Sequence, residues 1–273
     1  MNLKIDKQKL IDDIISHRHP CVEGDGLAPH RDVIQNIIKD TQALMYPSLF
    51  HDTRGEEQLI CSLHDNLLGE IEIALAEIGV KGKKAKEQAE KVSCEVIEHL
   101  PKLLDSLNKD IKAIYDGDPA ATSFKEIVLC YPGYFAIFCH RLAHELYIRK
   151  VPVVPRLISE FAHQKTGVDI NPGATIGSYF CIDHATGIVI GETAVIGDHV
   201  KIYQGVTIGA KSFEKDENGN PVKGGKRHPN IGNNVVIYAN ATILGGDTFI
   251  GDGCVVGSNT WITKSTEPGK LVV

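Results

Sequence analysis

The chain lacks the long apolar runs and paired cysteines that mark several classes of protein. It has 273 residues but no run of eighteen apolar residues, so we expect no membrane span. Residues 1–6 carry no apolar core of a secretory signal, and we expect a cytoplasmic protein. The seven cysteines are scattered without a Cys-x-x-Cys pair, which favours free thiols over a disulfide framework or a zinc site.

An excess of basic residues is missing as well. Lys and Arg number 29 against 35 Asp and Glu, which gives a formal net charge of -6. A general nucleic-acid binder usually carries a basic stripe, so we expect no nucleic-acid partner. The hydrophobic content of 42% is enough for a real core, and the length allows one large or two ordinary domains.

What the sequence does contain is a repeat of six residues between positions 168 and 262. A small aliphatic residue returns every six positions, and glycine often follows it. This period fits neither the 3.6 residues of a helix nor the two of an ordinary strand, but it suits short strands joined by tight turns. We predict a left-handed parallel β-helix of hexapeptide repeats. Its inward positions are Ile170, Ile176, Ile182, Ile190, Ile196, Ile202, Ile208, Ile231, Ile237, Ile243, Leu244, Ile250, Val256 and Ile262.

Two breaks interrupt this repeat. The first adds residues 183–187, where a plain coil would need none, and it holds His184. The second is the polar, glycine-rich stretch 211–229, which holds His228. Long loops on rigid scaffolds often carry function, so we predict that 211–229 is extruded from the coil and contributes to a site.

The first half of the chain has helical spacing instead, clearest in a stripe of apolar residues between Val92 and Ile114. Pro101 inside this stripe kinks the helix or marks a break. We predict that Asp118 caps the start of the following helix, with Pro119 at its first position. Further helices are predicted at 8–17, 32–44, 56–78 and 133–149, with a last one leading into the coil.

The fold class is therefore predicted to be α+β, with a helical domain before a β-helix. We place the helical domain at residues 1–155 and the β-helix at 156–273. The β-helix would include the extruded loop 211–229 and end in a short tail, 263–273.

A family resemblance rests on the run Asp183-His184-Ala185-Thr186-Gly187-Ile188. Together with residues 168–172 before it and Arg227-His228-Pro229 after it, this run closely resembles the serine O-acetyltransferases of bacteria and plants. Many acyltransferases share the bare repeat, but the two motifs together are much more specific. The resemblance covers residues 110–265 and the helical domain in outline. It implies that acetyl-CoA and L-serine give O-acetyl-L-serine and CoA, the first step of cysteine biosynthesis, with acetyl-CoA as co-substrate and no metal.

Acetyl transfer to a hydroxyl group requires a base, because an alcohol is a poor nucleophile at neutral pH. Histidine has a suitable pKa, and a carboxylate on its other ring nitrogen would fix its tautomer. His184 fits the base, and Asp169, fifteen residues earlier and so almost one coil away, fits its partner; the resemblance implies the same roles. The alternative is that His184 only fills a bulge and Asp169 only caps a turn.

Serine is a zwitterion, so its site should offer both a cation and an anion. Arg227 suits the serine carboxylate, with His228 beside it, while Asp118 and Asp183 suit the ammonium group. The resemblance implies that all four line the serine site. Helix capping alone would also explain Asp118, and Arg227 could be an ordinary loop charge. Glu192 matches a family position near the site, although a structural ion pair would explain it equally well.

The resemblance places the pantetheine arm of acetyl-CoA near Gly209, Ala210 and Ala239. Lysines in or beside the loop would suit its phosphates. They are Lys211, Lys223 and Lys226, and a solvated charged loop is the alternative reading of all three.

Three other functions stay open at this point. A sugar or xenobiotic O-acetyltransferase would differ only in the clamp for the amino acid. A zinc-dependent carbonic anhydrase on the same scaffold would need three converging histidines, for which His184, His199 and His228 are the candidates. A non-catalytic scaffold subunit would leave the site motifs unexplained.

The resemblance also implies partners. It predicts a homotrimer or a dimer of trimers, with each active site between neighbouring subunits. It predicts feedback inhibition by L-cysteine, which mimics serine. The short stretch 263–273 argues against docking into O-acetylserine sulfhydrylase, because relatives dock by a longer tail.

Overall fold

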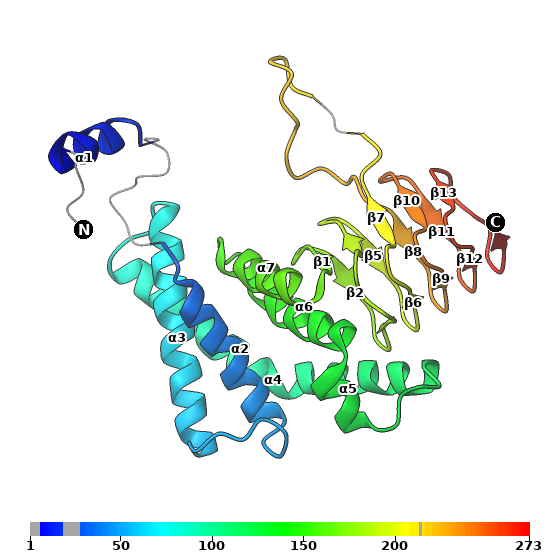
Figure 1. Cartoon of the computed structure of the whole chain (residues 1–273), viewed down its shortest axis with the longest axis horizontal. Helices are drawn as coiled ribbons and strands as arrows, with labels where there is room; N and C mark the ends of the chain where they lie inside the picture. The colour runs from blue at the N-terminus through cyan, green and yellow to red at the C-terminus, as the bar shows by residue number, and fades with distance from the viewer. Residues whose placement is uncertain (1–5, 19–27, 213–214) are drawn as a thin grey trace.

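The computed structural model describes residues 6–18, 28–212 and 215–273. In these parts of the chain, helices come first and short strands follow, wound into a coil (Figure 1). The helices are α1 (Lys7–Ser16), α2 (Arg31–Met45), α3 (Glu56–Glu77), α4 (Lys83–Gly117), α5 (Phe124–Cys130), α6 (Pro132–Ile148) and α7 (Val154–Thr166). The strands are β1 (Asp169–Ile170), β2 (Thr175–Ile176), β3 (Cys181–Ile182), β4 (Val189–Ile190), β5 (Val195–Ile196), β6 (Lys201–Ile202), β7 (Thr207–Gly209), β8 (Asn230–Ile231), β9 (Val236–Ile237), β10 (Thr242–Leu244), β11 (Phe249–Ile250), β12 (Val255–Val256), β13 (Trp261–Ile262) and β14 (Leu271–Val272).

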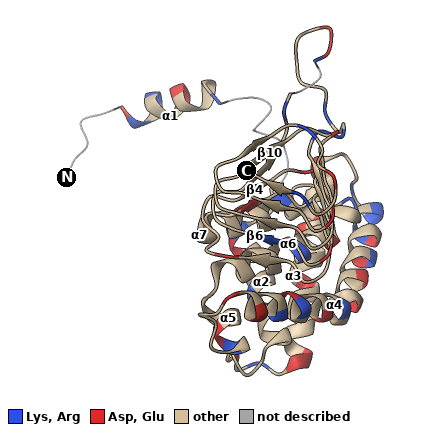
Figure 2. Ribbon diagram, turned by 90° about the vertical axis from the view of Figure 1, so that its right-hand side faces the viewer, with Lys and Arg blue, Asp and Glu red and all other residues tan. Residues whose placement is uncertain are grey.

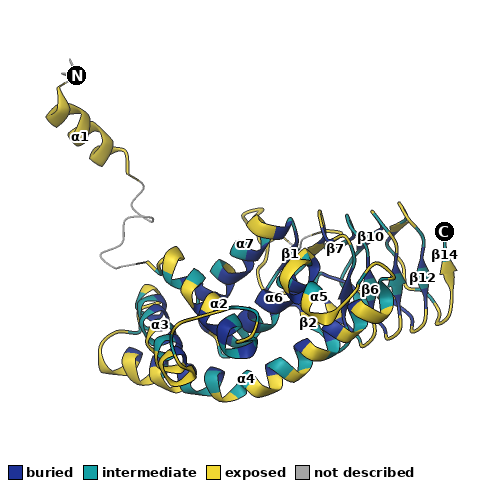
Figure 3. Cartoon of the chain, turned by 60° about the horizontal axis from the view of Figure 1, so that its bottom comes forward, coloured by how far each residue is buried: buried dark blue, intermediate teal, exposed yellow. Residues whose placement is uncertain are grey.

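The helices differ in how much of their surface is covered. α1 has no buried residue and is exposed along its whole length (Figure 3). The other helices each bury apolar side chains, in keeping with the helical spacing of the sequence. None of the helices in the described ranges combines the length and the hydropathy needed to span a bilayer.

The longest helix, α4, carries the predicted apolar stripe. Pro101 lies inside α4 without ending it, although proline lacks the N–H of one intrahelical bond. Basic and acidic residues are interspersed along α4 (Figure 2). Two exposed pairs on it join residues four positions apart, Asp105 with Lys109 and Lys112 with Asp116. The buried members of the stripe are Val92, Val96, Leu103, Leu107, Ile111 and Ile114.

The helix after α4 starts later than predicted. Asp118 is the C-cap of α4, so its prediction as an N-cap is wrong. Its carboxylate instead accepts a hydrogen bond from the N–H of Ala120 at 2.8 Å, which stabilises a turn. Ser123 caps α5 by accepting from the N–H of Glu126 at 3.2 Å.

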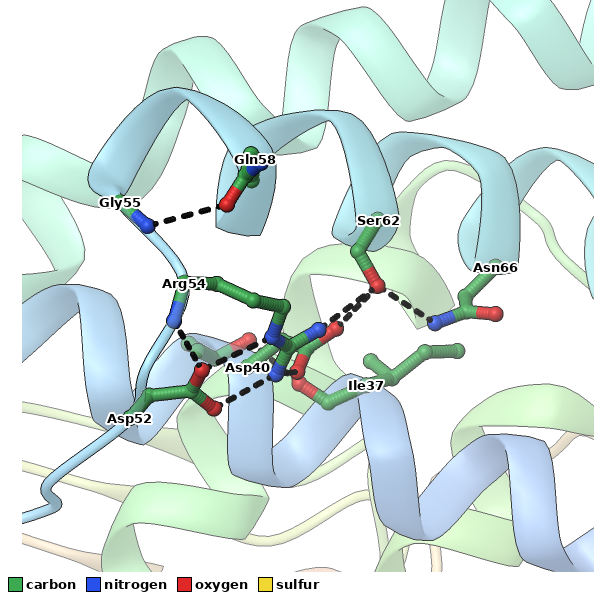
Figure 4. Close-up of polar contacts among 9 residues, drawn as sticks. Ile37, Asp40, Asp52, Arg54, Gly55, Gln58, Ser62 and Asn66 are labelled. Atoms are coloured by element: carbon green, nitrogen blue, oxygen red, sulfur yellow. Dashed lines mark hydrogen bonds and ion pairs between the residues drawn. The ribbon is translucent and has the colours of Figure 1, made fainter.

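An ionic cluster around the buried carboxylate of Asp40 joins α2 to α3 (Figure 4). Asp40 is 2% exposed and accepts hydrogen bonds from Arg54 Nη2 at 2.6 Å and Ser62 Oγ at 2.7 Å. Arg54 also donates to Asp52 at 2.7 and 2.9 Å, which lowers the pKa of Asp52 to about 2. A buried carboxylate is costly unless it is paired, so this cluster fixes how the two helices meet.

The strands form three parallel sheets, and each full coil contributes one strand to each sheet. The strand orders are β1-β4-β7-β10-β13, β2-β5-β8-β11 and β3-β6-β9-β12-β14. Neighbours within each sheet belong to successive coils, so each inner strand pairs with the coil before it and the coil after it, and each strand at the end of a sheet pairs with one. The predicted fold class, a helical region followed by a parallel β-helix, is confirmed.

Two ladders of side chains fill the coil. The predicted inward positions are buried except Ile176 and Leu244, which are partly covered. A second ladder, two residues before the inward isoleucine or valine and so directly ahead of the strand, was not predicted. Its buried members include Val168, Ala174, Phe180, Ile188, Ala194, Val200, Val206, Val235, Ala241, Thr248 and Cys254.

The two breaks of the repeat are local additions to the coil. Asp169 pairs with Val189 and Val189 with Thr207, so the first coil is two residues longer than the second. The second break leaves the coil between β7 and β8 and projects from it (Figure 1). Residues 263–273, predicted as a tail, add strand β14, which pairs with β12 and extends the coil.

The helices and the coil meet at a buried ion pair. Asp110 of α4 accepts hydrogen bonds from Arg141 Nε at 2.6 Å, from Arg141 Nη2 at 2.8 Å and from the N–H of Phe180 at 2.9 Å. Arg141 of α6 also donates to the carbonyl of Gly177 at 2.8 Å. One side-chain pair therefore fixes two helices against the coil, and with them the end of α4 at Asp118.

The last helix, α7, carries the chain from the helices into the coil. It packs against α6 and also against β1. The predicted domain boundary between residues 155 and 156 falls within its first turn. The division of the chain at that point stays a prediction.

Candidate active site

Each coil turns at three corners, and the predicted site residues fall mainly on two of them. The first corner comprises residues 183–188, continued in the next coils by 203–206 and 238–241. The second corner comprises residues 191–194 and the extruded loop 210–229. In the order of the chain, a sheet face separates the two corners.

His184 projects from the first corner. Its φ of 61° and that of Ala185, 78°, lie in the left-handed region, which is uncommon for residues other than glycine. The side chain of His184 is 71% exposed, and its Nε2 lies 3.9 Å from Oδ1 of Asp183. The extra residues of the first break thus present an accessible imidazole next to a carboxylate.

Asp183 is less exposed and already has a cationic partner. Lys201 Nζ lies 2.9 Å from its Oδ2 and also donates to the carbonyl of Gly117 at 2.7 Å. Burial alone would lower the pKa of Lys201, but hydrogen bonds to Tyr203 and Asp183 raise it, so the lysine stays charged. Lys201 therefore links Asp183 to the end of α4.

Asp118 lies at the same corner. Tyr131 donates its hydroxyl hydrogen to Oδ2 of Asp118 at 2.7 Å, and this bond is the main reason that the pKa of Asp118 is lowered. The charges of Lys201 and His184 lower it further. The same hydrogen bond raises the pKa of Tyr131 to about 12. The structure thus brings Asp118 of the helical region together with Asp183 and His184 of the coil.

The backbone of Asp169 lies beside this corner, but its side chain contacts a different residue. Its N–H donates to the carbonyl of Ile188 at 2.9 Å, so β1 runs alongside the end of the His184 turn. Its carboxylate lies 3.7 Å from Arg156 Nη2. No hydrogen bond or ion pair joins the described side chains of Asp169 and His184, so the structure does not bring the predicted dyad into contact.

Arg227 anchors the second corner. Its guanidinium forms an ion pair with Glu192, which also accepts a hydrogen bond from the hydroxyl of Tyr147 at 2.9 Å. The hydrogen bond from Arg227 is the main cause of the lowered pKa of Glu192. Arg227 thereby acquires an internal partner, and α6 is tied to the loop that carries it.

His228 is buried next to Arg227. It is 7% exposed, and its Nδ1 accepts a hydrogen bond from the N–H of Thr193 at 3.1 Å. Burial, with help from the charge of Arg227, lowers the pKa of His228 to about 4. Its ring covers Gly191 so closely that a Cβ there would lie 2.0 Å from it. The lowered pKa favours a neutral imidazole at pH 7, and the hydrogen bond accepted by Nδ1 favours the tautomer with its proton on Nε2.

The residues predicted to contact acetyl-CoA are divided in the same way. Gly209 ends β7 and Ala210 begins the extruded loop, whereas Ala239 lies at the first corner. A cavity of about 340 Å³ opens at the base of the loop and is lined by Lys211, Lys226 and Arg227 among others. Lys223 lines an adjoining cavity of about 310 Å³ with Glu192.

The sequence patterns did not single out four residues that shape these corners. Tyr131 and Lys201 hold the carboxylates of the first corner, and Tyr147 and Thr193 hold the second. No spacing rule marks them, because each acts through a contact between segments far apart in the chain. The sequence held one indication of the role of Lys201, because it is a charged residue directly before an inward isoleucine.

The geometry also bears on the carbonic anhydrase alternative. His184 and His228 lie at the first and second corners, and His199 lies at the third, residues 197–200. Within one chain they do not converge on a common ion. Among the described residues, two other groups have ligand atoms close enough to share a metal ion: His64, Glu90 and Cys94, and Glu160, His163 and Asp169.

Comparison with known proteins adds sequence relatives. Residues 58–139 match the family model described as the amino-terminal part of serine acetyltransferase. A plasmid-encoded serine acetyltransferase of Synechococcus elongatus is 54% identical over 173 residues, which cover 63% of this chain and 54% of that protein. The serine acetyltransferase of Mycobacterium tuberculosis is 45% identical over 171 residues, which cover 63% of this chain and 70% of that one. This chain thus spans about half the length of the Synechococcus relative.

Solved structures agree with the sequence relatives. Serine acetyltransferase 1 of Entamoeba histolytica in complex with L-cysteine has a TM-score of 0.77 and 31% identity, covering 94% of this chain and 92% of that one. The serine acetyltransferase of Neisseria gonorrhoeae in complex with serine has a TM-score of 0.58 and 28% identity, covering 87% of this chain and 92% of that one.

Proposed function

Since this chain belongs to the serine acetyltransferase family, we propose that it transfers the acetyl group of acetyl-CoA to the hydroxyl group of L-serine. The products are O-acetyl-L-serine and CoA, and the reaction is the first step of cysteine biosynthesis. One observation carries the proposal: the exposed His184 stands at the same corner as the carboxylates of Asp118 and Asp183.

In the proposed mechanism His184 is the general base. Its imidazole takes the proton of the serine hydroxyl while the oxygen attacks the thioester carbonyl carbon, which gives a tetrahedral intermediate. Collapse of the intermediate breaks the carbon–sulfur bond, and the imidazolium returns its proton to the departing CoA sulfur. The exposure of His184 supports this role, because both substrates must reach it.

We further propose that Asp169 orients His184. Its backbone contact with Ile188 supports this, because β1 already runs beside the His184 turn. The role requires the carboxylate of Asp169 to move away from Arg156, 3.7 Å away, and toward the imidazole.

Recognition of serine is proposed to use both corners. Asp118 and Asp183 would bind its ammonium group, and Arg227 with His228 would bind its carboxylate. Lys201 already neutralises part of the charge of Asp183, so Asp118 is the stronger partner for the ammonium group. Glu192 would hold Arg227 in place through their ion pair.

A complete site is proposed to need more than one copy of the chain. His184 and Arg227 lie at different corners, and one rigid coil cannot bring its own two corners together. Packing of coils side by side would place the first corner of one copy against the second corner of another. This arrangement supports a trimer, or a dimer of trimers, with sites at its subunit boundaries.

Acetyl-CoA is proposed to lie along the same boundary. Gly209 and Ala210 would face its pantetheine arm from one copy and Ala239 from the other. Lys211 and Lys226, which line the cavity below the extruded loop, would meet its phosphates. The reaction as proposed uses no metal.

The likeness to the Entamoeba enzyme in complex with L-cysteine supports a further proposal, that cysteine inhibits this enzyme by occupying the serine site. Cysteine carries the same ammonium and carboxylate groups as serine, so the two corners would bind it equally well. We place the protein in the cytoplasm, where both substrates are available.

Release of CoA from acetyl-CoA tests the reaction itself. L-serine is compared with D-serine, homoserine, a hexose and no acceptor. Saturable turnover that is selective for L-serine is expected. Turnover with the hexose alone would favour a sugar O-acetyltransferase, and no turnover with any acceptor would favour a scaffold.

Replacement of the base gives the sharpest test of the mechanism. His184→Ala should lower kcat by on the order of 10²–10⁴-fold, the usual contribution of a general base. His199→Ala is the matched control, because His199 also occupies a left-handed corner position, with φ of 56°. Near-normal turnover by the His184 variant, with the coil intact, would remove it as the base.

Arg227→Ala tests the carboxylate clamp. We expect the KM for serine to rise while the KM for acetyl-CoA stays within about twofold, because the proposed contact is to serine alone. An unchanged serine KM would show that Arg227 only holds Glu192.

A further inference from the structure

A second group of polar side chains lies in the helical region, away from the corners of the coil. His64 of α3 faces Glu90 and Cys94 of α4. The Nε2 atom of His64 lies 3.4 Å from Glu90 Oε1 and 3.9 Å from Cys94 Sγ. All three ligand atoms lie within 4.8 Å of one another. The proposed acetyl transfer uses none of them.

These separations are close to those of a tetrahedral metal site. With zinc bonds of about 2.0–2.1 Å to nitrogen, about 2.0–2.2 Å to oxygen and about 2.3 Å to sulfur, the nitrogen–oxygen edge is about 3.3–3.5 Å. The nitrogen–sulfur edge is about 3.5–3.6 Å. The nitrogen–oxygen separation already matches, and the nitrogen–sulfur separation is longer by a few tenths of an ångström. The oxygen–sulfur separation is within 4.8 Å, and a bound ion would bring it to about 3.6 Å.

The second nitrogen of His64 points to the same chemistry. Nδ1 lies 3.5 Å from Oδ1 of Asp65. A metal-bound histidine commonly donates its other ring N–H to a carboxylate, which leaves the ligating nitrogen with its lone pair toward the ion. Asp65 therefore favours the tautomer of His64 that a metal ion would need.

The helical geometry explains why the three ligands stay together. Glu90 and Cys94 are four residues apart on α4, so they share one face of that helix. α3 packs along α4 and presents His64 to this face. The side chain of Glu90 is 53% exposed, so an ion could enter from solvent, and water could fill its fourth position.

We propose that His64, Glu90 and Cys94 form a zinc(II) site that joins α3 to α4. Binding replaces the thiol proton of Cys94, which is released to solvent, and forms one bond each to sulfur, nitrogen and oxygen. Thiolate and carboxylate together balance the charge of the ion. The site ties two helices that otherwise meet through apolar side chains, and it is independent of the acetyl transfer.

Cobalt(II) titration of the full-length protein tests this proposal. Tetrahedral cobalt bound to a thiolate gives a near-ultraviolet charge-transfer band together with intense visible bands, and zinc should displace it. We expect one equivalent to bind, with the thiolate band lost in Cys94→Ser and weakened in His64→Gln. Cys61→Ser and Cys130→Ser are the matched controls, since both thiols are exposed and neither belongs to the group.

A second measurement separates a built site from a chance thiol. Asp65→Asn should lower the affinity for cobalt by about 10–100-fold while leaving the thiolate band in place. Added zinc should raise the Tm of the natural protein and of Cys61→Ser, but not that of Cys94→Ser. The absence of a thiolate band in the natural protein, or an equal band in Cys94→Ser, would overturn the proposal whatever the acetyltransferase activity.

Discussion

The helical region and the coil bury polar groups to very different extents. Of the buried polar residues in the described parts of the chain, all but two lie in the helical region. The coil holds only His228 and Thr248, whereas the helical region holds Asp40, Thr41, Glu70, Ser93, Asp110, His140, Ser159 and Thr166. In the coil, the backbone N–H and C=O groups of each strand form hydrogen bonds with the neighbouring strands, so the side chains of the interior can be apolar. Helices form their backbone hydrogen bonds internally, so specific polar contacts between side chains are needed to fix how the helices pack together.

Because the packing of the helical region depends on buried charges, removal of one of them should cause the largest loss of stability. Arg141→Met leaves the carboxylate of Asp110 buried, with only the N–H of Phe180 as a partner, and should cost about 3–5 kcal/mol of unfolding free energy. Denaturant unfolding followed by circular dichroism measures this cost. The loss should appear in both regions, because Arg141 also binds the carbonyl of Gly177 in the coil.

The matched control removes an arginine from a surface pair. Arg156 is 46% exposed and pairs with Glu160 four positions away, so Arg156→Met should cost about 0–1 kcal/mol. Equal losses in the two variants would contradict the claim that burial of the pair, and not its charge alone, organises the helical region.

The same contrast explains how much of the fold the sequence could predict. The six-residue repeat specifies the coil almost residue by residue, because its interior is a regular stack, and most of the inward positions were predicted correctly. The helices were also located, but not their packing, which depends on pairs such as Asp110 and Arg141 that are 31 positions apart. The start of α5 was missed because Asp118 and Ser123 are both good capping residues, and only the turn between them decides which one caps.

The site was predictable in composition and less so in geometry. The motif around His184 and the later Arg227 marked the two corners, and Asp118 is near enough to His184 for the imidazole to lower the pKa of its carboxyl group slightly. The sequence could not show that Lys201 pairs with Asp183, or that Asp169 faces Arg156, since these contacts depend on side-chain direction. The assignment of catalytic roles to these residues stays a prediction.

Acidification should destabilise both regions by a smaller amount, because a neutral histidine is buried in each of them. Burial lowers the pKa of His228 to about 4 and that of His140 well below its usual 6.5. Below pH 6.5 the unfolded chain binds more protons at these positions than the folded one, so stability falls as the pH drops from 6.5 toward 4. Thermal unfolding at pH 7 and pH 5 measures the loss.

Two variants show how much of the stability lost at low pH comes from each region. His228→Asn keeps an acceptor near Thr193 but cannot take up a proton, and it should remove part of the pH dependence without abolishing folding. His140→Asn should remove another part. If the ring protons of His228 titrate near pH 6.5 in an NMR titration, the burial argument for the coil is wrong.

The smallest expected effect concerns apolar volume, in which the two regions should agree. Ile202 of the coil and Ile71 of α3 are both fully buried, and each Ile→Val change should cost about 0.5–1.5 kcal/mol, because one methyl group is lost from a packed interior. Ile60, 43% exposed on the same helix as Ile71, provides the control, and Ile60→Val should stay within about 0.5 kcal/mol. The three unfolding free energies separate two views of the coil. Similar losses at Ile202 and Ile71 mean that the regions differ only in their buried charges, whereas a clearly larger loss at Ile202 means that each rung of the ladder also supports the rungs above and below it.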